Sequence, residues 1–181
     1  MGRPQVPIEV DDASGVWSVD GLPMILVPRH FLVNNHLAIE AALGAANYAA
    51  LLFEAGHRSA YTWCEHEART RGLKDTGVFH HYLKRLSQRG WGQFAAESVE
   101  PATGRARVTV ANSVFVLAQD VLGQHGSVPR ATCYMFRGWF AGALEFVGAQ
   151  RGKRIVLASE EIECAAAGRQ DRCVFQIAPA A

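Results

Sequence analysis

The sequence lacks the features by which several common protein classes are recognised. It contains no run of about 18 apolar residues, so no membrane-spanning helix is expected. The opening segment, MGRPQVPIEVDD, has no apolar stretch of the kind found in secretion signals. These absences predict a cytoplasmic protein.

The sequence also lacks an excess of charge of either sign. The 181-residue chain carries 18 basic and 17 acidic residues, spread along its length, and its formal net charge is +1. Because no stretch is basic enough to follow a phosphate backbone, nucleic acid is not an expected partner. Glycine-rich phosphate loops and the G-x-S-x-G motif are also missing, so no pattern indicates a nicotinamide, a flavin or a serine hydrolase.

Hydrophobic residues are abundant, at 49% of the chain, which is enough for one domain with a sizeable core. The order of periodic patterns predicts an α+β fold in which an antiparallel sheet packs with helices. Helices are expected over residues 28–44, 47–70, 78–88 and 131–150, with a weaker helical pattern over 113–123. Strands are expected over 91–99, 105–110, 154–158 and 173–177.

Residues 1–27 form an arm with the signals of extended chain. Valine, isoleucine and tryptophan alternate with polar residues there, ahead of a turn expected at residues 21–23. This pattern predicts a short strand or hairpin that docks on the body of the protein. The chain is thus divided into the arm and a single domain of residues 28–181.

The four cysteines are unevenly distributed, since Cys133, Cys164 and Cys173 lie near the C-terminus and Cys64 lies apart. In a reducing cytoplasm, structural disulfides between them are not expected. Buried thiols, metal ligands or a reactive group are the alternatives. The uneven distribution is the first indication of a functional site.

Glu161 precedes Cys164 by three residues, so that a tight turn can aim both side chains at one point. Zinc takes four ligands in a tetrahedron, usually thiolates and imidazoles and occasionally a carboxylate. From spacing alone, a zinc site and a chance cluster of buried thiols are equally good interpretations. Glu160 and Glu163 flank Glu161 and compete with it as the carboxylate ligand.

The C-terminal segment resembles the 4-vinyl reductase domain family. The resemblance is carried by CYMFRGWFAGALEFVG (133–148), EIEC (161–164) and a final cysteine followed by VFQI, so the specific motif spans 133–177. This family is a small ligand-binding domain that occurs alone and as the sensory module of phenol- and xylene-responsive transcription activators. Gly138 and Gly142 match its helix glycines, where close packing leaves no room for a side chain.

By position, the resemblance assigns four ligands to a zinc site. The site would be structural, because three sulfurs and one oxygen leave no coordination position open. The resemblance also implies a bacterial protein and a fold shared with nitric oxide sensors and vesicle-tethering subunits. The ligands are Cys133, Glu161, Cys164 and Cys173.

The resemblance further implies a pocket between the helices and the sheet for a small, partly apolar molecule. For most of its candidate residues, a filled core is the better interpretation. The phenol sensors carry a tryptophan where this chain has Val110, so phenol recognition is not carried over. The candidate lining residues are Phe53, His57, Tyr61, Trp91, Phe94, Val110, Phe115, Tyr134 and Trp139.

Three functions are therefore open. The first is a zinc-stabilised, sensor-like domain that binds a small molecule without catalysis, acting as a homodimer with a separate effector protein. The second is an enzyme or accessory protein of a catabolic pathway, either 4-vinyl reductase-like or acting on aromatic or N-methylated compounds. The third is a scaffold or adaptor. The sequence names neither the ligand nor the pathway.

Overall fold

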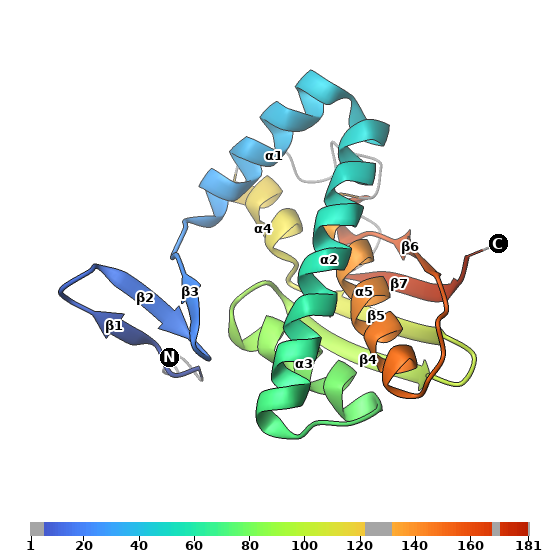
Figure 1. Cartoon of the computed structure of the whole chain (residues 1–181). Coiled ribbons are helices and arrows are strands. Elements are labelled where there is room, and N and C mark those ends of the chain that lie inside the picture. The colour runs from blue at the N-terminus through green and yellow to red at the C-terminus, as the bar shows by residue number, and fades with distance from the viewer. Residues whose placement is uncertain (1–5, 122–131, 168–170, 181) are drawn as a thin grey trace.

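The computed structural model describes residues 6–121, 132–167 and 171–180. It confirms an α+β fold with antiparallel sheets (Figure 1). The elements, in chain order, are β1 (Glu9–Asp11), β2 (Val16–Val19), β3 (Leu22–Met24), α1 (Arg29–Leu43), α2 (Ala45–Arg71), α3 (Thr76–Gln88), β4 (Gln93–Glu100), β5 (Arg105–Ala111), α4 (Val114–Val121), α5 (Tyr134–Gln150), β6 (Leu157–Glu163), a short 3-10 helix (Ala165–Ala167) and β7 (Arg172–Pro179).

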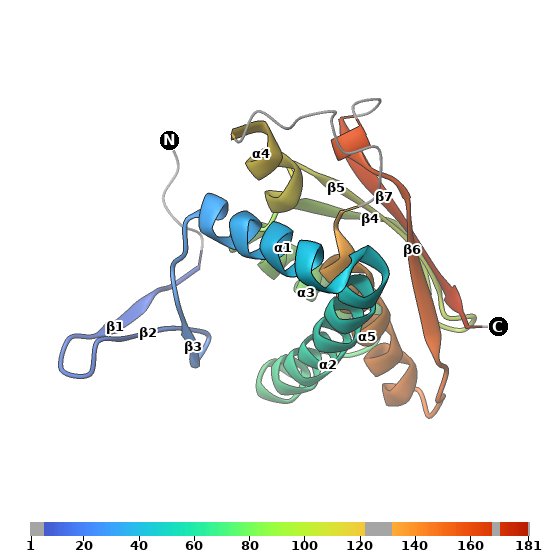
Figure 2. The same ribbon diagram turned by 90° about the horizontal axis from the view of Figure 1, so that it is seen from above.

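The main sheet has the strand order β4-β5-β7-β6, with every neighbouring pair antiparallel. Helix α5 lies against one face of this sheet, and α2 lies on the outer side of α5 (Figure 2). Strands β5 and β7 are central, and they present buried residues such as Val108 and Phe175 to the helices. The aromatic rings of Phe140 and Phe175 meet edge to face, with their centroids 5.0 Å apart. The core therefore sits between α5 and the sheet.

Glycines bring α2 and α5 into backbone contact. A methyl group on Gly138 would overlap the carbonyl oxygen of Phe53, and one on Gly142 would overlap that of His57. A methyl group on Gly56 would lie 2.7 Å from the carbonyl oxygen of Met135. The expectation that the helix glycines mark close packing is thus confirmed.

The N-terminal strands form a separate three-stranded sheet, in the order β1-β2-β3, beside the helical body (Figures 1 and 2). The expected turn at residues 21–23 is wrong by two positions. Asp20 and Gly21 both have positive φ, which is the backbone of a two-residue hairpin turn, and Pro23 lies in the edge strand β3. The Asp-Gly pair is the stronger hairpin signal.

Asp20 also joins this sheet to α2 and α3. Its side chain is only 2% exposed and forms ion pairs with three arginines. Arg71 lies 2.8 Å from one carboxylate oxygen, Arg89 lies 2.9 Å from the other, and Arg85 contacts the same oxygen as Arg89. Burial raises the pKa of Asp20, but hydrogen bonds and charge attraction from Arg85 and Arg89 outweigh it and hold the pKa below its usual value.

Strand β6 differs from expectation and matters for the site. A strand was expected over 154–158, followed by a loop, whereas the observed strand begins at Leu157 and ends at Glu163. Its pairing with β7 continues because Glu161 lies opposite Phe175, with an irregularity between Glu161 and Glu163. Glu161 is therefore held on a strand.

Among the helices of the described residues, none combines the length and the apolar character needed to span a bilayer. The weak helical pattern over 113–123 corresponds to α4, although residues 122 and 123 lie outside the described ranges. Helix α5 starts at Tyr134, three residues later than expected. Residue 131 is likewise outside the described ranges.

Candidate metal centre

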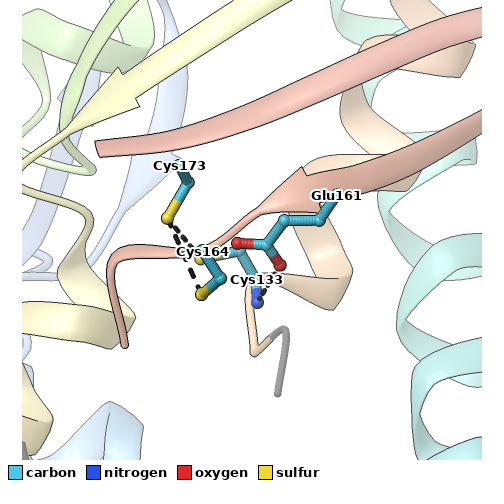
Figure 3. Close-up of side chains that lie close together, drawn as sticks. All are labelled: Cys133, Glu161, Cys164 and Cys173. Carbon is cyan, nitrogen blue, oxygen red and sulfur yellow. Dashed lines mark hydrogen bonds between the residues drawn. The ribbon is translucent and has the colours of Figure 1, made fainter. Parts of the chain in front are cut away.

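The fold brings the four predicted ligands to one point, although they come from three elements (Figure 3). Cys133 is the N-cap residue of α5, and Glu161 lies on β6. Cys164 follows the end of β6, and Cys173 is the second residue of β7. Their ligand atoms all lie within 4.8 Å of one another. Within the described ranges, this is the one such group of histidine, cysteine, aspartate or glutamate.

The sulfur atoms have the spacing that a tetrahedral metal site requires. The Sγ atom of Cys173 lies 3.8 Å from that of Cys133 and 3.8 Å from that of Cys164. Zinc–sulfur bonds of about 2.3 Å place two sulfurs of a tetrahedron about 3.8 Å apart. A disulfide would require about 2.05 Å, so the three thiols are unbonded to one another.

Glu161 completes the cluster and offers one carboxylate oxygen as a ligand atom. Its Oε2 accepts a hydrogen bond of 3.0 Å from the backbone N–H of Cys133, which fixes the carboxylate against the start of α5. Its Oε1 is buried and, in the part of the chain that the structure describes, has no donor at hydrogen-bond geometry. Glu160 is exposed on the same strand, and Glu163 is not part of the cluster. The geometry thus favours Glu161 among the three glutamates.

A second layer of hydrogen bonds surrounds the sulfurs. The hydroxyl oxygen of Ser113 lies 3.2 Å from the Sγ of Cys133, and the backbone N–H of Ala165 donates to the Sγ of Cys173 at 3.4 Å. The hydroxyl of Thr132 lies 3.9 Å from the Sγ of Cys164. Sequence reasoning missed Ser113, which lies far from the cysteines along the chain. Such outer partners orient metal ligands.

The charges of the cluster favour a cation. Burial, followed by the nearby thiolate of Cys164, raises the pKa of Glu161 to about 8. Hydrogen bonds from Cys133 and Cys173 lower the pKa of Cys164 to about 2, whereas burial raises that of Cys133 well above its usual value. Burial therefore opposes ionisation of the whole cluster. Full ionisation would place four negative charges together, which a bound divalent cation would offset.

The arrangement suits a structural metal. Three thiolates and one carboxylate fit zinc and fill its four positions, which leaves no place for a reacting water. Cys133 and Cys173 are 0% exposed and Cys164 is 8% exposed, so substrate cannot reach the sulfurs directly. The positive end of the α5 dipole faces the same point and favours anionic ligands.

The nine residues predicted to line a ligand pocket are spread over the core. Trp139 packs edge to face on Trp91 at 4.9 Å, and Phe94 packs on Phe136 at 5.1 Å. Val110 is fully buried, while Phe115 and Tyr134 both lie against the ring of His36. Phe94 and Val110 thus help to fill the space between α5 and the sheet, whereas Phe115 and Tyr134 pack beside α1.

The remaining predicted pocket residues, on α2, are half-buried beside α5. Phe53 stacks on His57, and His57 forms an ion pair of 2.9 Å with Glu145 of α5. The hydrogen bond that His57 donates to Glu145 is the main cause that raises the pKa of His57, against the opposing effect of burial. Tyr61 and Glu145 line an open hollow of about 600 Å³ beside the loop before β6. His57 thus joins two helices, which is a structural role.

A different cavity opens between the arm and the body. It measures about 370 Å³ and shares Trp91 with the predicted set. Its other walls come from the arm, α1 and the end of α3. Sequence reasoning missed this cavity because it depends on how the arm docks, and residue periodicity does not report docking.

Known structures share this fold. The phenol-responsive sensory domain of the transcription activator PoxR aligns with a TM-score of 0.79 and 15% identity, covering 95% of this chain and 84% of that domain. A vinyl-4-reductase family protein from Methanocaldococcus jannaschii aligns with a TM-score of 0.53 and 15% identity, covering 87% and 85%. The fold expected from the resemblance is confirmed.

A third structure is a trafficking protein particle complex subunit 3 from Naegleria fowleri, covalently bound to palmitic acid. It has a TM-score of 0.54 and 12% identity, and the alignment covers 84% of this chain and 95% of the subunit. The comparison with curated proteins gives no match. One family model matches residues 2–97, more than half of the 181 residues, and the chain therefore belongs to the family described as domain of unknown function (DUF5943).

Proposed function

We propose that this protein is a zinc-stabilised domain that binds a small molecule, in the manner of a sensor, without catalysis of its own. The observation that carries the zinc proposal is the convergence of Cys133, Glu161, Cys164 and Cys173 within 4.8 Å. The sulfur spacing, the buried carboxylate oxygen and the absence of an open coordination position all support a structural zinc site over a catalytic one.

The small-molecule part of the proposal is supported by fold. The PoxR domain, whose structure was determined with phenol, superimposes over nearly the whole chain. A molecule held between the helices and the sheet would have to displace rings such as Phe94 and Trp139 from their present contacts. The proposal of binding does not depend on that location, because the cavity beside the arm offers a second one.

A second copy of the chain and a separate effector protein are the proposed partners. Large apolar side chains are exposed along α1 and at the start of α2, where they could meet their equivalents in a homodimer. These are Phe31, Ile39, Leu43 and Leu51. Size-exclusion chromatography with light scattering would give twice the chain mass for a homodimer, and a Leu43→Asp variant would give the monomer mass.

A scaffold or adaptor is the second candidate function. It is supported by the ring-on-ring packing between α5 and the sheet, which leaves that interior filled. An enzyme or catabolic accessory protein has less support, because the described ligand cluster is closed and four of the nine predicted pocket residues belong to the buried core.

Two measurements test the proposal. Metal analysis of the purified protein should give about one zinc per chain. A folded protein without bound metal would contradict the zinc part. Native mass spectrometry should show small-molecule adducts that disappear on unfolding, and a protein that retains no small molecule under any condition would favour the scaffold.

A further inference from the structure

The cavity between the arm and the body has the size of a small-molecule site. Its volume of about 370 Å³ falls within the range of roughly 300–1,000 Å³ that is usual for such sites. The arm lines it with Trp17 of β2 and the segment Ile25–Leu26, and the body lines it with Leu32 of α1 and Trp91. The arm and the body thus each contribute one tryptophan.

The arm side of the cavity is unusually apolar for a surface. Ile25 is 79% exposed, Leu26 is 73% exposed and Trp17 is 38% exposed. Three strands of three or four residues form a sheet that is marginally stable alone, so its apolar side chains need a partner. A ligand in the cavity would cover these side chains and remove their apolar surface from water.

The polar groups of the cavity are cationic. Arg29 and Arg89 both line it, and the lining formed by the described residues contains no aspartate or glutamate. Arg29 donates one hydrogen bond of 3.3 Å to the carbonyl oxygen of Gly90, which lies at the same cavity. Arg89 pairs with Asp20 through Nη2, but its buried Nε has no hydrogen-bond partner in the described part of the chain. An anionic group would satisfy these donors.

We propose that this cavity binds a small apolar carboxylate, with its tail between Trp17, Leu26 and Trp91 and its carboxylate at Arg29. This inference rests on the proposed small-molecule function and names its ligand class. A neutral molecule would fill the apolar part but would offer no anion to Arg29. A carboxylate of moderate length uses both parts of the cavity.

Asp20 ties the arm, which lines one part of the cavity, to the body. It fixes the β2–β3 turn to α2 and α3 through its three arginines, and one of them, Arg89, is also a cavity residue. The ion pairs of Asp20 therefore hold the arm in position over the ligand. Removing the charge of Asp20 should weaken ligand binding, although Asp20 itself does not contact the ligand.

The test compares octanoate with octan-1-ol, which has the same chain without the charge. Binding is measured by isothermal titration calorimetry and by the intrinsic tryptophan fluorescence, to which Trp17 and Trp91 contribute along with Trp63 and Trp139. The full-length protein should prefer octanoate. Arg29→Met should weaken octanoate binding by about tenfold and leave octan-1-ol binding nearly unchanged, because it removes one charged donor. Arg69→Met is the matched control, since Arg69 is exposed on α2 outside the cavity and should change neither affinity.

A second variant, Leu26→Ser, weakens the apolar wall at an exposed position and should lower the affinity for both molecules. Octanoate binding that is unchanged in both Arg29→Met and Leu26→Ser would overturn the cavity while leaving small-molecule binding elsewhere in place. A shift from dimer to monomer in Leu26→Ser without any loss of affinity would identify the surface as an interface between copies, which also overturns the inference. If neither molecule binds, the inference about the cavity is overturned. The zinc content would still test the proposed function separately.

Discussion

At the C-terminal end of the fold, α5, β6 and β7 meet at a cluster of four buried side chains, whereas at the N-terminal end three short strands meet the body at one carboxylate. The cluster joins its elements through sulfurs 3.8 Å apart and a hydrogen bond from the start of α5. The arm leaves residues such as Ile25 and Leu26 exposed and relies on Asp20. One end is thus fixed by a buried cluster, and the other by one carboxylate together with the packing of Leu22 against the core.

This difference separates two tasks within one small chain. A region that is held by a buried cluster and backbone-close helices keeps its shape over wide conditions. A region that is held by one charged group can open and close at a modest free-energy cost. The family match over residues 2–97 contains the arm, Asp20 and its arginines, and it stops before the first residue of the cluster. The arm and its cavity are therefore inside the matched region.

The largest effect is expected from breaking the cluster. Cys164→Ala should abolish zinc binding and lower the free energy of unfolding by about 3 kcal/mol or more, because the metal contributes to folding. For a chain of this size, that corresponds to a fall of about 6–12 °C in Tm. Calorimetry and metal analysis check both parts.

Cys64→Ala is the matched control for that variant, since Cys64 is fully buried but outside the cluster. It should lower Tm through lost packing while keeping one zinc per chain. Loss of zinc from both variants alike would mean that the metal is held elsewhere.

The glycine contact between α2 and α5 provides a comparable test without metal. Gly138→Ala should destabilise the protein by about 3 kcal/mol, because the new methyl group meets the carbonyl oxygen of Phe53. Gly77→Ala, on α3, meets no atom within 4 Å and should instead stabilise by about 0.5–1 kcal/mol. Chemical denaturation measures both, and equal effects would show that the helices can separate to admit a side chain.

Asp20→Asn should release the arm while leaving the body folded. The loss of its charge-assisted hydrogen bonds is expected to cost about 2 kcal/mol locally. Hydrogen exchange should then accelerate at residues 16–24 and remain slow in α5. A uniform acceleration over the whole chain would show that the arm is integral to the core.

The same site predicts a pH effect for the unmodified protein. Because the pKa of Asp20 is lowered in the folded state, its contribution is fully present above its unfolded pKa of about 3.9. It is lost as the pH falls through the lower, folded value. Arm protection should therefore be constant from about pH 5 upward and decrease only in strong acid.

The smallest effect is expected at His57, which joins α2 to α5 in the body of the protein. Its pKa is raised by Glu145, so its contribution is fully present below the unfolded pKa of about 6.5 and is lost as the pH rises through the folded value. His57→Gln should therefore cost about 0.5 kcal/mol at pH 6 and less at pH 9. A pH-independent difference between the two proteins would assign the effect to packing.

Sequence periodicity was sufficient for the order of helices and strands, because each long element has a regular apolar face. It was insufficient for β6, whose later residues are mostly glutamates and are placed by pairing with β7. The four cluster residues could be predicted because cysteine and glutamate at such spacing resemble a known ligand set. The choice of Glu161 among three glutamates needed the strand register.

The arm shows where sequence reasoning stops. Its extended character was visible, but the partners of Asp20 were not, because Arg71, Arg85 and Arg89 become neighbours only when α2 and α3 pack together. The cavity has the same origin, since its walls are separated by more than 60 residues along the chain. Ser113, which contacts Cys133, has no local signal of its own.

The depth of the cluster has a consequence for exchange kinetics. Its cysteines are between 0% and 8% exposed, so a chelator in solution has no direct access to a cation held there. Release would have to wait until the start of α5 separates from the β6–β7 hairpin. The rate of zinc loss should consequently be independent of chelator concentration at saturation and should equal the rate of that local opening. The rate of metal loss would then measure how often the start of α5 separates from the β6–β7 hairpin.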